Sequence, residues 1–344
     1  MFKLPLTAAA ALLAAASVTH AEVPKVATDI APVHALAARL MQGLGEPDLV
    51  VPPGASPHGY SMRPSEARAL AQADLVFWMG EALTPWMHGA MTELAGDARV
   101  VELLEVDGTL VLPFRTGVGF EAHGHDAHGG EDHDDHEAED HSGHDEDHHD
   151  EAVEAHEDGH DGHDDHAEHD HAHAEGIDPH AWLAPENGKL WLDVMAAELS
   201  RLDPENAAIY AENADAAKVE IEAAEVRVNA ELTAFRAQKF VVFHDAYQYF
   251  ERSFDLQASG AIALGDASDP SPARIAEIQQ VVAQNGVTCV FSEPQFNPDL
   301  VTTVLDGSAA KTVVLDPVGA HLKPGAGFYT ALLEDLGAAM ASCH

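Results

Sequence analysis

The stretch that decides the fold runs from residue 24 to residue 51 and reads PKVATDIAPVHALAARLMQGLGEPDLVV. It contains two short apolar runs, at 26–29 and 49–51, separated by a helix-like segment at 32–41. Short strands that alternate with helices favour βαβ units and a mostly parallel sheet. The same alternation continues through a helix-like segment at 64–73 and apolar runs at 75–78 and 99–103.

The second half of the chain repeats this rhythm. Three runs there are rich in β-branched and aromatic residues, and the helix expected at 272–284 places Ile275, Ile278 and Val282 on one face. The three runs are residues 240–243, 287–291 and 312–315. We therefore expect a second α/β domain.

A long helical segment separates the two halves. Asp203 and Pro204 offer an N-cap and a first helical position, and no Gly or further Pro follows until beyond residue 235. One apolar stripe marks this helix, formed by Ile221, Val228, Leu232 and Phe235. The predicted fold is α/β, with two Rossmann-like lobes of mostly parallel sheet joined by a long rigid helix. The expected boundaries are 22–200 for the first lobe, 201–236 for the connecting helix and 237–344 for the second lobe.

The first 21 residues have the pattern of a signal peptide. Lys3 supplies a weak positive charge, an apolar run follows at 4–16, and Thr19-His20-Ala21 precedes the expected cleavage site. The apolar run is too short to span a bilayer, and no later run reaches the roughly 18 apolar residues that a transmembrane helix needs. We expect export and a mature chain that begins near Glu22. A retained N-terminal anchor is the alternative.

Residues 121–175 form a segment of a different kind. They contain 16 of the 24 histidines and 23 acidic side chains, with no Lys or Arg. Such a segment buries too little apolar surface to offset its ordering entropy, so we predict a disordered loop. The chain as a whole has a net charge of −42. This acidity argues against nucleic acid and anionic lipid as partners and favours cations.

The two cysteines, Cys289 and Cys343, are few and even in number. In an oxidising compartment this favours one disulfide. A cysteine-based metal site is disfavoured, because neither residue has a Cys or His partner at ligand spacing.

Three histidines outside the His-rich segment have unusual surroundings. His58 ends a proline-rich loop after the run at 49–51, His180 follows Pro179, and His244 follows the run at 240–243. Ligands of open parallel sheets bind beyond the carboxyl ends of the strands, which is also where Glu293 and Asp316 fall. Three imidazoles with one carboxylate or water are a tetrahedral zinc set, so a zinc site is expected in the interdomain cleft. The other histidines are expected to be structural or on the surface, namely His34, His88, His321 and His344.

Seven motifs in order resemble the ZnuA-type zinc-uptake receptors, the substrate-binding proteins of ATP-driven metal importers. The resemblance covers nearly the whole mature chain. The motifs are PGASPH (53–58), YSMRP (60–64), ADLVFW (73–78), DPHAW (178–182), HDAYQYF (244–250), SEPQF (292–296) and LDPVG (315–319).

The resemblance implies specific roles. His58, His180 and His244 match the family's zinc-binding histidines, and Asp316 matches an Asp that closes the site in some members, while in others water takes that place. Glu293 is expected to support the site, and the two cysteines match the family's disulfide. The implied protein is a monomeric periplasmic receptor and not an enzyme. It carries Zn²⁺ as transported ligand to a permease in the inner membrane, which works with a cytoplasmic ATPase.

Alternative functions stay open at this point. A secreted zinc hydrolase would need a general base, for which Glu293 is the candidate. A periplasmic zinc buffer would rely on the segment at 121–175, whose histidines either feed the tight site, sense excess metal or bind zinc incidentally. Related receptors take manganese or iron, but manganese-binding relatives have Glu at the position of His244. The HExxH pattern at 156–160 is a chance match, because Gly159 and the surrounding charge disfavour the helix it requires.

Overall fold

The computed structural model describes residues 23–115, 117, 119–120, 176–263, 265 and 270–343. The predicted signal peptide, the predicted disordered segment at 121–175 and His344 lie outside these residues. Among the helices described, none is both long enough and apolar enough to cross a membrane.

The N-terminal sheet consists of four parallel strands in the order β2-β1-β3-β4. Its strands are β1 (Val26–Thr28), β2 (Asp48–Leu49), β3 (Leu75–Trp78) and β4 (Arg99–Glu102). The helices that connect them are α1 (Ala31–Leu40), α2 (Pro64–Ala71) and α3 (Pro85–Leu94), and the 3₁₀ turn η1 (Leu103–Glu105) follows β4. The parallel sheet predicted from the alternating runs is confirmed.

The C-terminal sheet has the same strand order, β6-β5-β7-β8, and is also parallel. Its strands are β5 (Phe240–His244), β6 (Gly260–Ala263), β7 (Cys289–Ser292) and β8 (Lys311–Val314). The helices among them are α6 (Gln248–Phe254), α7 (Pro272–Gln284) and α8 (Pro298–Val304). In each sheet the chain builds one neighbour of the first strand and then crosses to its other side. The gap between β1 and β3, and between β5 and β7, is therefore a topological switch point.

Strands β1, β3, β5, β6 and β7 are almost entirely buried, as expected for strands of a parallel sheet that is covered on both faces, whereas the edge strands β2, β4 and β8 carry charged and exposed residues. In β5, Val241 and Phe243 point toward the cluster formed with α7 and α8, whereas Val242 points into the main core. In β3, Leu75 and Phe77 join the main core. The main core contains residues from both sheets and from the long helices that lie along them. The two halves are thus held together by one continuous apolar core.

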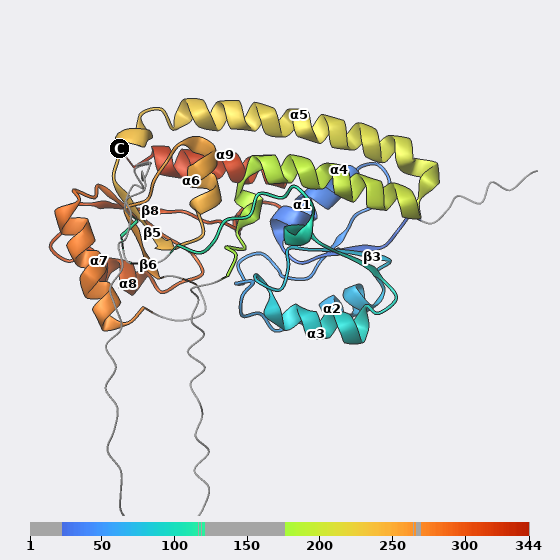
Figure 1. Ribbon diagram of the computed structural model, residues 1–344, viewed down its shortest axis with the longest axis horizontal. Coiled ribbons are helices and arrows are strands. Elements are labelled where there is room, and N and C mark those ends of the chain that lie inside the picture. Colours follow the sequence, from blue (N-terminus) through green and yellow to red (C-terminus); the bar gives the residue numbers. More distant parts are fainter. Residues whose placement is uncertain are drawn as a thin grey trace, which may run out of the picture. The chain divides into compact units, whose positions relative to one another are not determined.

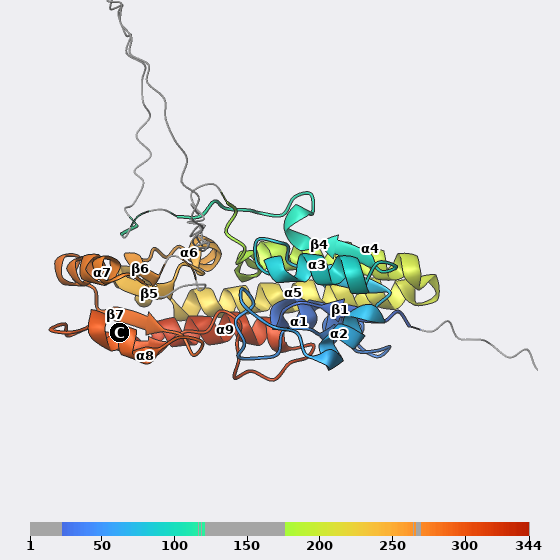
Figure 2. The same ribbon diagram turned by 90° about the horizontal axis from the view of Figure 1, so that it is seen from below.

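Three long helices complete the main core: α4 (Pro185–Leu202), α5 (Ala207–Glu231) and α9 (Phe328–Ala341). Helix α5 packs against α1, α4 and α9, and so contacts elements of both halves (Figures 1 and 2). At about 1.5 Å per residue its 25 residues span about 37 Å. The predicted long helix is confirmed, and all four residues of its predicted stripe are buried.

Helix α5 is shorter at both ends than the range 201–236 predicted from the sequence. Asp203 does not cap it, because its carboxylate accepts hydrogen bonds from the Asn206 side chain at 2.7 Å and from the Tyr210 hydroxyl at 2.9 Å. Separate 3₁₀ turns, η3 (Pro204–Asn206) and η4 (Phe235–Ala237), flank the helix.

Prolines and one glycine fix where the helices begin and how closely they approach. Six of the described α-helices have proline in their first two positions, where the missing N–H costs nothing. Gly188 in α4 lies against α9, and a Cβ at this position would stand 2.4 Å from the hydroxyl oxygen of Tyr329. That hydroxyl donates to the carbonyl of Trp182 at 2.8 Å, so the close approach ties α9 to the 3₁₀ turn η2 (Ala181–Leu183).

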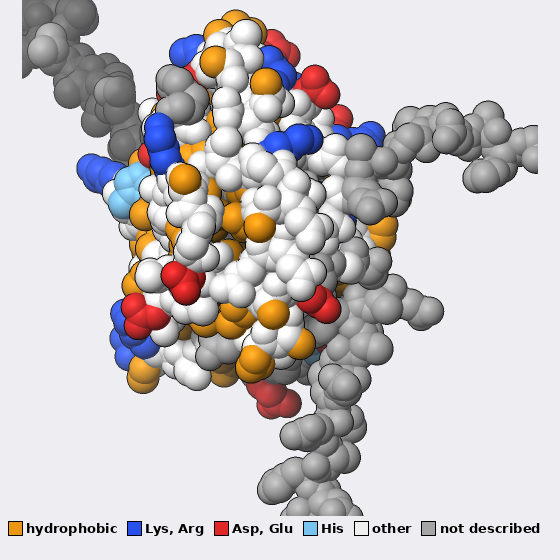
Figure 3. Space-filling model, turned by 90° about the vertical axis from the view of Figure 1, so that its left-hand side faces the viewer, with side chains coloured by type: hydrophobic (Ala, Val, Ile, Leu, Met, Phe, Trp, Pro, Cys, Tyr) orange, Lys and Arg blue, Asp and Glu red, His pale blue; other side chains and the backbone are white. Residues whose placement is uncertain are grey.

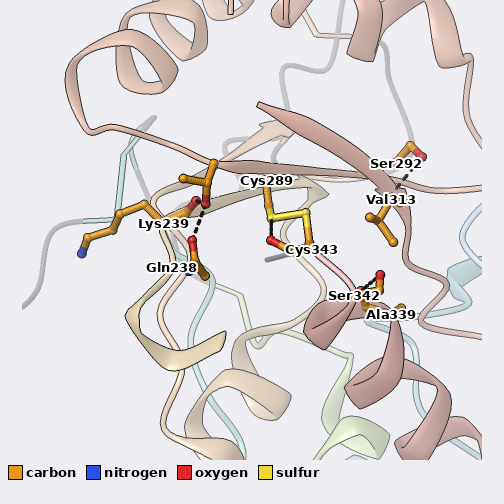
Figure 4. The surroundings of a disulfide bond; sticks show 9 residues. Gln238, Lys239, Cys289, Ser292, Val313, Ala339, Ser342 and Cys343 are labelled. Atoms are coloured by element: carbon orange, nitrogen blue, oxygen red, sulfur yellow. Dashed lines mark hydrogen bonds between the residues drawn. A yellow bond between two sulfur atoms is a disulfide. The ribbon is translucent and has the colours of Figure 1, made fainter. Parts of the chain in front are cut away.

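The predicted disulfide is confirmed. Cys289, the first residue of β7, is bonded to Cys343, which follows α9, across 54 residues of sequence (Figure 4). Both cysteines are buried, so the bond fixes the end of the chain to the middle of the C-terminal sheet.

The surface at the α7 and α8 end is mixed in character. Figure 3 shows apolar, acidic and basic side chains interspersed on this face. Apolar side chains scattered in this way are ordinary for a protein surface.

Candidate metal centre

His58 is placed by the loop that follows β2. The backbone N–H groups of Val50 and Val51 donate to the carbonyls of Thr28 and Asp29, which extends the pairing with β1 beyond the strand itself. The loop then turns through its prolines and is anchored from α3. There the indole N–H of Trp86 donates to the carbonyl of Pro57 at 2.7 Å, immediately before the half-buried His58.

His180 is fixed by a carboxylate two residues earlier. Oδ1 of Asp178 accepts a hydrogen bond from the backbone N–H of His180 at 3.0 Å and lies 2.7 Å from its Nδ1. Pro179 between them restricts the backbone, and η2 begins directly after. His180 is buried at 4% exposure. A carboxylate on Nδ1 directs the other ring nitrogen, Nε2, away from Asp178.

His244 is held in the same manner at the switch point of the C-terminal sheet. It ends β5, and Glu293 follows the adjacent strand β7. Oε1 of Glu293 accepts from the backbone N–H of His244 at 3.2 Å and lies 2.8 Å from its Nδ1. Both side chains are buried. The strand order therefore brings this carboxylate to the imidazole it orients.

The three histidines line one pocket. Nε2 of His180 lies 3.3 Å from Nε2 of His244, and their ring centroids are 5.1 Å apart. The ring of His58 lies 5.5 Å from that of His180. The pocket is also lined by Ser56, Trp182, Glu293, Gln295, Phe296 and Val318.

The distance between Nε2 of His180 and Nε2 of His244 matches that of two imidazole nitrogens bound to one zinc ion. Two nitrogens at about 2.05 Å from a tetrahedral zinc are about 3.3 Å apart. Among the described residues, however, no three His, Cys, Asp or Glu side chains stand close enough together to hold a metal ion in this arrangement. His180 and His244 are thus set at ligand spacing, and His58 faces them from the other sheet.

Burial changes the acidity of the carboxylates around this pocket. It raises the pKa of Asp178 to about 7, against the opposing effects of the His180 N–H, Gln248 and Arg115. Burial likewise raises the pKa of Glu293, which the neighbouring His244 opposes. A cation at the histidines would favour the ionised form of both groups.

A partly buried guanidinium, that of Arg115, pairs with Asp245, the residue directly after β5. Arg115 bonds to both Asp245 and Glu251, with Nη1 donating to Glu251 at 2.9 Å and Nε to Asp245 at 3.0 Å. Its guanidinium carbon also lies 3.9 Å from the centre of the Phe120 ring. Burial still raises the pKa of Asp245 to about 6, with Arg115 opposing. Arg115 thus stabilises the turn that follows His244.

Asp316 is placed differently from the other predicted ligands. It is buried beyond β8, and its two oxygens accept three hydrogen bonds, from Nε2 of Gln295 at 2.9 Å and from the backbone N–H groups of Val318 and Ala320. It is not among the residues that line the histidine pocket, whereas Gln295 is. The structure therefore brings the three histidines together and sets Asp316 behind Gln295.

The remaining described histidines have ordinary surroundings. Nε2 of His34 lies 3.0 Å from the carbonyl of Pro47, His88 is exposed near Glu81, and His321 lies 3.1 Å from Asp335. Sequence reasoning did not single out Asp178, Gln295 or Arg115. Asp178 and Gln295 lie within the DPHAW and SEPQF motifs, so their nearness in sequence to His180 and Glu293 could have indicated a role at the site. Arg115 lies more than 100 residues before its partners, and nothing local marks it.

Comparison with known proteins identifies the family of the chain. Residues 26–343 match the family described as ZnuA, zinc-uptake complex component A periplasmic. The chain belongs to the ZnuA family. It is 44% identical over 339 residues to the high-affinity zinc uptake system protein ZnuA of Paracoccus denitrificans (strain Pd 1222), which spans 98% of this chain and 97% of that protein. Its identity to the protein of the same name from Brucella abortus (strain 2308) is 44% over 318 residues, or 92% of this chain and 91% of that one.

Solved structures show the same fold. A crystal structure of ZnuA has a TM-score of 0.66 at 20% identity and covers 93% of this chain and 99% of its own. The periplasmic zinc binding protein TroA from Treponema pallidum has a TM-score of 0.66 at 17% identity, covering 93% and 98%. The predicted fold and family are confirmed. The prediction of a binding component that is not an enzyme agrees with the family, a component of a zinc-uptake complex.

Proposed function

We propose that this protein captures one Zn²⁺ in the periplasm through His58, His180 and His244 and delivers it to the membrane permease of an ATP-driven importer. The observation that carries the proposal is the 3.3 Å separation of Nε2 of His180 and Nε2 of His244. Each ring has its Nδ1 beside a carboxylate, so a neutral ring would donate Nδ1–H and keep the Nε2 lone pair for a metal.

Zinc binding would draw His58 toward the other two imidazoles. His58 lies on the loop of the N-terminal sheet, whereas His244 ends a strand of the C-terminal sheet, so a bound ion would connect the two sheets. The main core and α5 already connect them. Only a local adjustment of the loop at 52–58 is then needed, and a wide hinge movement is not part of the proposal.

The fourth coordination position belongs to Asp316 or to water. The three donors on the Asp316 oxygens favour water, because a ligating oxygen of Asp316 would have to give up part of this bonding. Glu293 is a poor candidate for the fourth ligand. A carboxylate on Nδ1 of His244 lies on the far side of that ring from a metal on Nε2.

The wider setting is proposed from the family. The relatives are named as high-affinity zinc uptake system proteins, which supports a periplasmic location, export through residues 1–21 and a permease with its ATPase as partner. We also propose a monomer with lobes at 22–200 and 237–344. The role of residues 121–175 in gathering zinc stays a prediction, because the segment lies outside the described residues.

Competitive titration of the full chain with Zn²⁺ and Mn²⁺ tests the proposal. We expect one tight zinc site, strong preference for zinc, and a loss of at least 100-fold in zinc affinity in His58→Ala. The matched control is His88→Ala, which changes an exposed histidine and should leave the tight site intact. Equal affinity of wild type and His58→Ala would refute the site.

Deletion of residues 121–175 separates a receptor from a zinc buffer. A receptor keeps its tight site after the deletion, because the three histidines lie outside the deleted segment. A buffer would lose nearly all of its zinc capacity. A preference for Mn²⁺ in the same titration would instead identify a manganese receptor.

A further inference from the structure

The pocket contains a buried amide oxygen, Oε1 of Gln295, whose role the three histidines do not explain. Two oxygens of pocket-lining residues are buried without a hydrogen-bond partner among the described residues, Oε2 of Glu293 and Oε1 of Gln295. A buried acceptor without a partner lowers stability unless something occupies it. Glu293 already serves His244 through its other oxygen. Gln295 has no such bond to a histidine, so its oxygen needs a separate explanation.

The orientation of Gln295 follows from the charge of its neighbour. Nε2 of Gln295 lies 2.9 Å from Oδ1 of Asp316. An ionised carboxylate has no hydrogen to donate and can only accept hydrogen bonds. The amide of Gln295 must therefore present its NH₂ group to Asp316. Oε1 then points to the opposite side of the same planar amide. Asp316 itself is held in place by the backbone N–H groups of Val318 and Ala320.

We propose that Oε1 of Gln295 faces the fourth coordination position of the metal and accepts a hydrogen bond from the water bound there, and that Asp316 is the positioning residue that orients the amide. The inference rests on the proposed function and deepens it. A metal-bound water is a strong donor, because the cation increases its acidity. The amide of Gln295 is neutral, so it accepts this hydrogen bond without adding a negative charge to a site made of neutral imidazoles.

A double-mutant cycle tests the assignment on the full chain, with one equivalent of zinc and a competing chelator. We expect Gln295→Ala and Asp316→Ala each to lower zinc affinity about tenfold, and the double variant to lower it no further than Gln295→Ala alone. Non-additivity is expected when two residues act through one contact. A loss from Asp316→Ala that is equally large in the Gln295→Ala background would show that Asp316 acts directly on the metal, and would overturn the proposal.

Asp316→Asn guards against failure of Asp316→Ala to fold. Its amide oxygen still accepts from Gln295 and from the N–H of Val318, and only the bond to Ala320 is lost. We expect zinc affinity within threefold of wild type. A loss of 100-fold in a variant with an unchanged unfolding temperature would mean that the charge of Asp316 binds the metal, and would overturn the assignment.

The visible absorption spectrum of bound Co²⁺ gives a readout that a purely structural role would not move. Gln295→Ala should shift the ligand-field bands, because the water on the metal loses its acceptor. The matched control is Gln279→Ala, whose amide donates to the carbonyl of Thr303 far from the pocket. An unchanged spectrum and affinity in Gln295→Ala would overturn the inference alone. A wild-type protein without a tight zinc site would instead overturn the proposed function.

Discussion

The two sheets have the same strand order but different chemistry at their switch points. In the C-terminal sheet, His244 ends the first strand, and Glu293, which directly follows the neighbouring strand β7, orients it. In the N-terminal sheet the equivalent position after β1 holds Asp29. Its carboxylate accepts from the backbone N–H groups of Ile30 and Met79, both at 2.8 Å, and is completely buried.

The difference shows that the same strand order creates the same position at the end of a strand in both sheets, and that the side chain at this position determines what it can bind. An imidazole at the strand end can present its outer nitrogen to a pocket, whereas the Asp29 carboxylate is shared between two backbone donors within its own sheet. The N-terminal sheet contributes its proposed ligand from a neighbouring position instead, the loop after β2 that ends in His58. In the proposed function, the C-terminal switch point therefore binds the metal, whereas the N-terminal switch point stabilises the backbone of its own sheet.

The largest expected effect comes from replacing the residue at each switch point, His244 or Asp29, by alanine. His244→Ala should lower zinc affinity at least 1,000-fold while changing the unfolding free energy little, because it removes a ligand from the pocket. Asp29→Ala should do the reverse, destabilising the fold by about 2 kcal/mol as two buried N–H groups lose their acceptor. Zinc titration and chemical unfolding of both variants check this. If Asp29→Ala also lowered zinc affinity 1,000-fold, the assignment of metal binding to the C-terminal switch point alone would be wrong.

The guanidinium beside the C-terminal switch point provides the next test. Arg115→Ala leaves Asp245 and Glu251 buried without their cation, which should cost about 3 kcal/mol of unfolding free energy. The control is Arg99→Ala, which breaks an ion pair with Glu198 in which the arginine is largely exposed, and should cost about 0.5 kcal/mol. Urea unfolding of both variants measures the difference. Equal costs would mean that Arg115 has no special role next to His244.

The carboxylates that orient the imidazoles are expected to have an intermediate effect. Glu293→Gln should weaken zinc binding by about tenfold to 100-fold, since outer carboxylates fix the ring and raise its basicity. The same change at the N-terminal switch point, Asp29→Asn, should leave zinc affinity within about twofold. Isothermal titration of the two variants in parallel compares them. A similar loss in both would point to general disruption of the fold.

The last expected effect is a pH dependence of stability that belongs to the N-terminal sheet. Burial raises the pKa of Asp29 from 3.8 to about 7, with the N–H groups of Met79 and Ile30 opposing. The folded state therefore binds this proton more tightly than the unfolded state. The stability it contributes is fully present below about pH 4 and is lost as the pH rises through about 7.

Asp29→Asn removes this titration. The unfolding free energy of wild type relative to Asp29→Asn should fall by up to about 1.4 kcal/mol per pH unit between pH 4 and pH 7. Unfolding of both proteins in urea across this range measures the slope. A relative stability that rises with pH would contradict the assignment of the raised pKa to Asp29.

The sequence alone determined the architecture to a large extent. Alternating apolar runs predicted both parallel sheets, and α7 has the bounds that its periodicity predicted. The apolar stripe predicted the long helix α5, although only Ile221 and Val228 of its four residues lie within the helix. Strand β6, with the sequence GAIA, was not predicted, because Ile262 is its only large apolar side chain and four residues are too few to show a period. Proline contexts and strand ends singled out His58, His180 and His244 among 24 histidines, and the structure places these three side chains in one pocket. Their role as zinc ligands stays a prediction.

Only the tertiary structure decided how the selected residues are used. The sequence could not show that Nε2 of His180 and Nε2 of His244 are at zinc spacing, since 64 residues separate them and only the packed core sets the distance. Nor could it show that Asp316 bonds to Gln295 rather than facing the pocket. Local residues determine where a strand or helix begins and ends. The partner that a buried carboxylate receives depends on which distant donors the fold brings within about 3 Å of it.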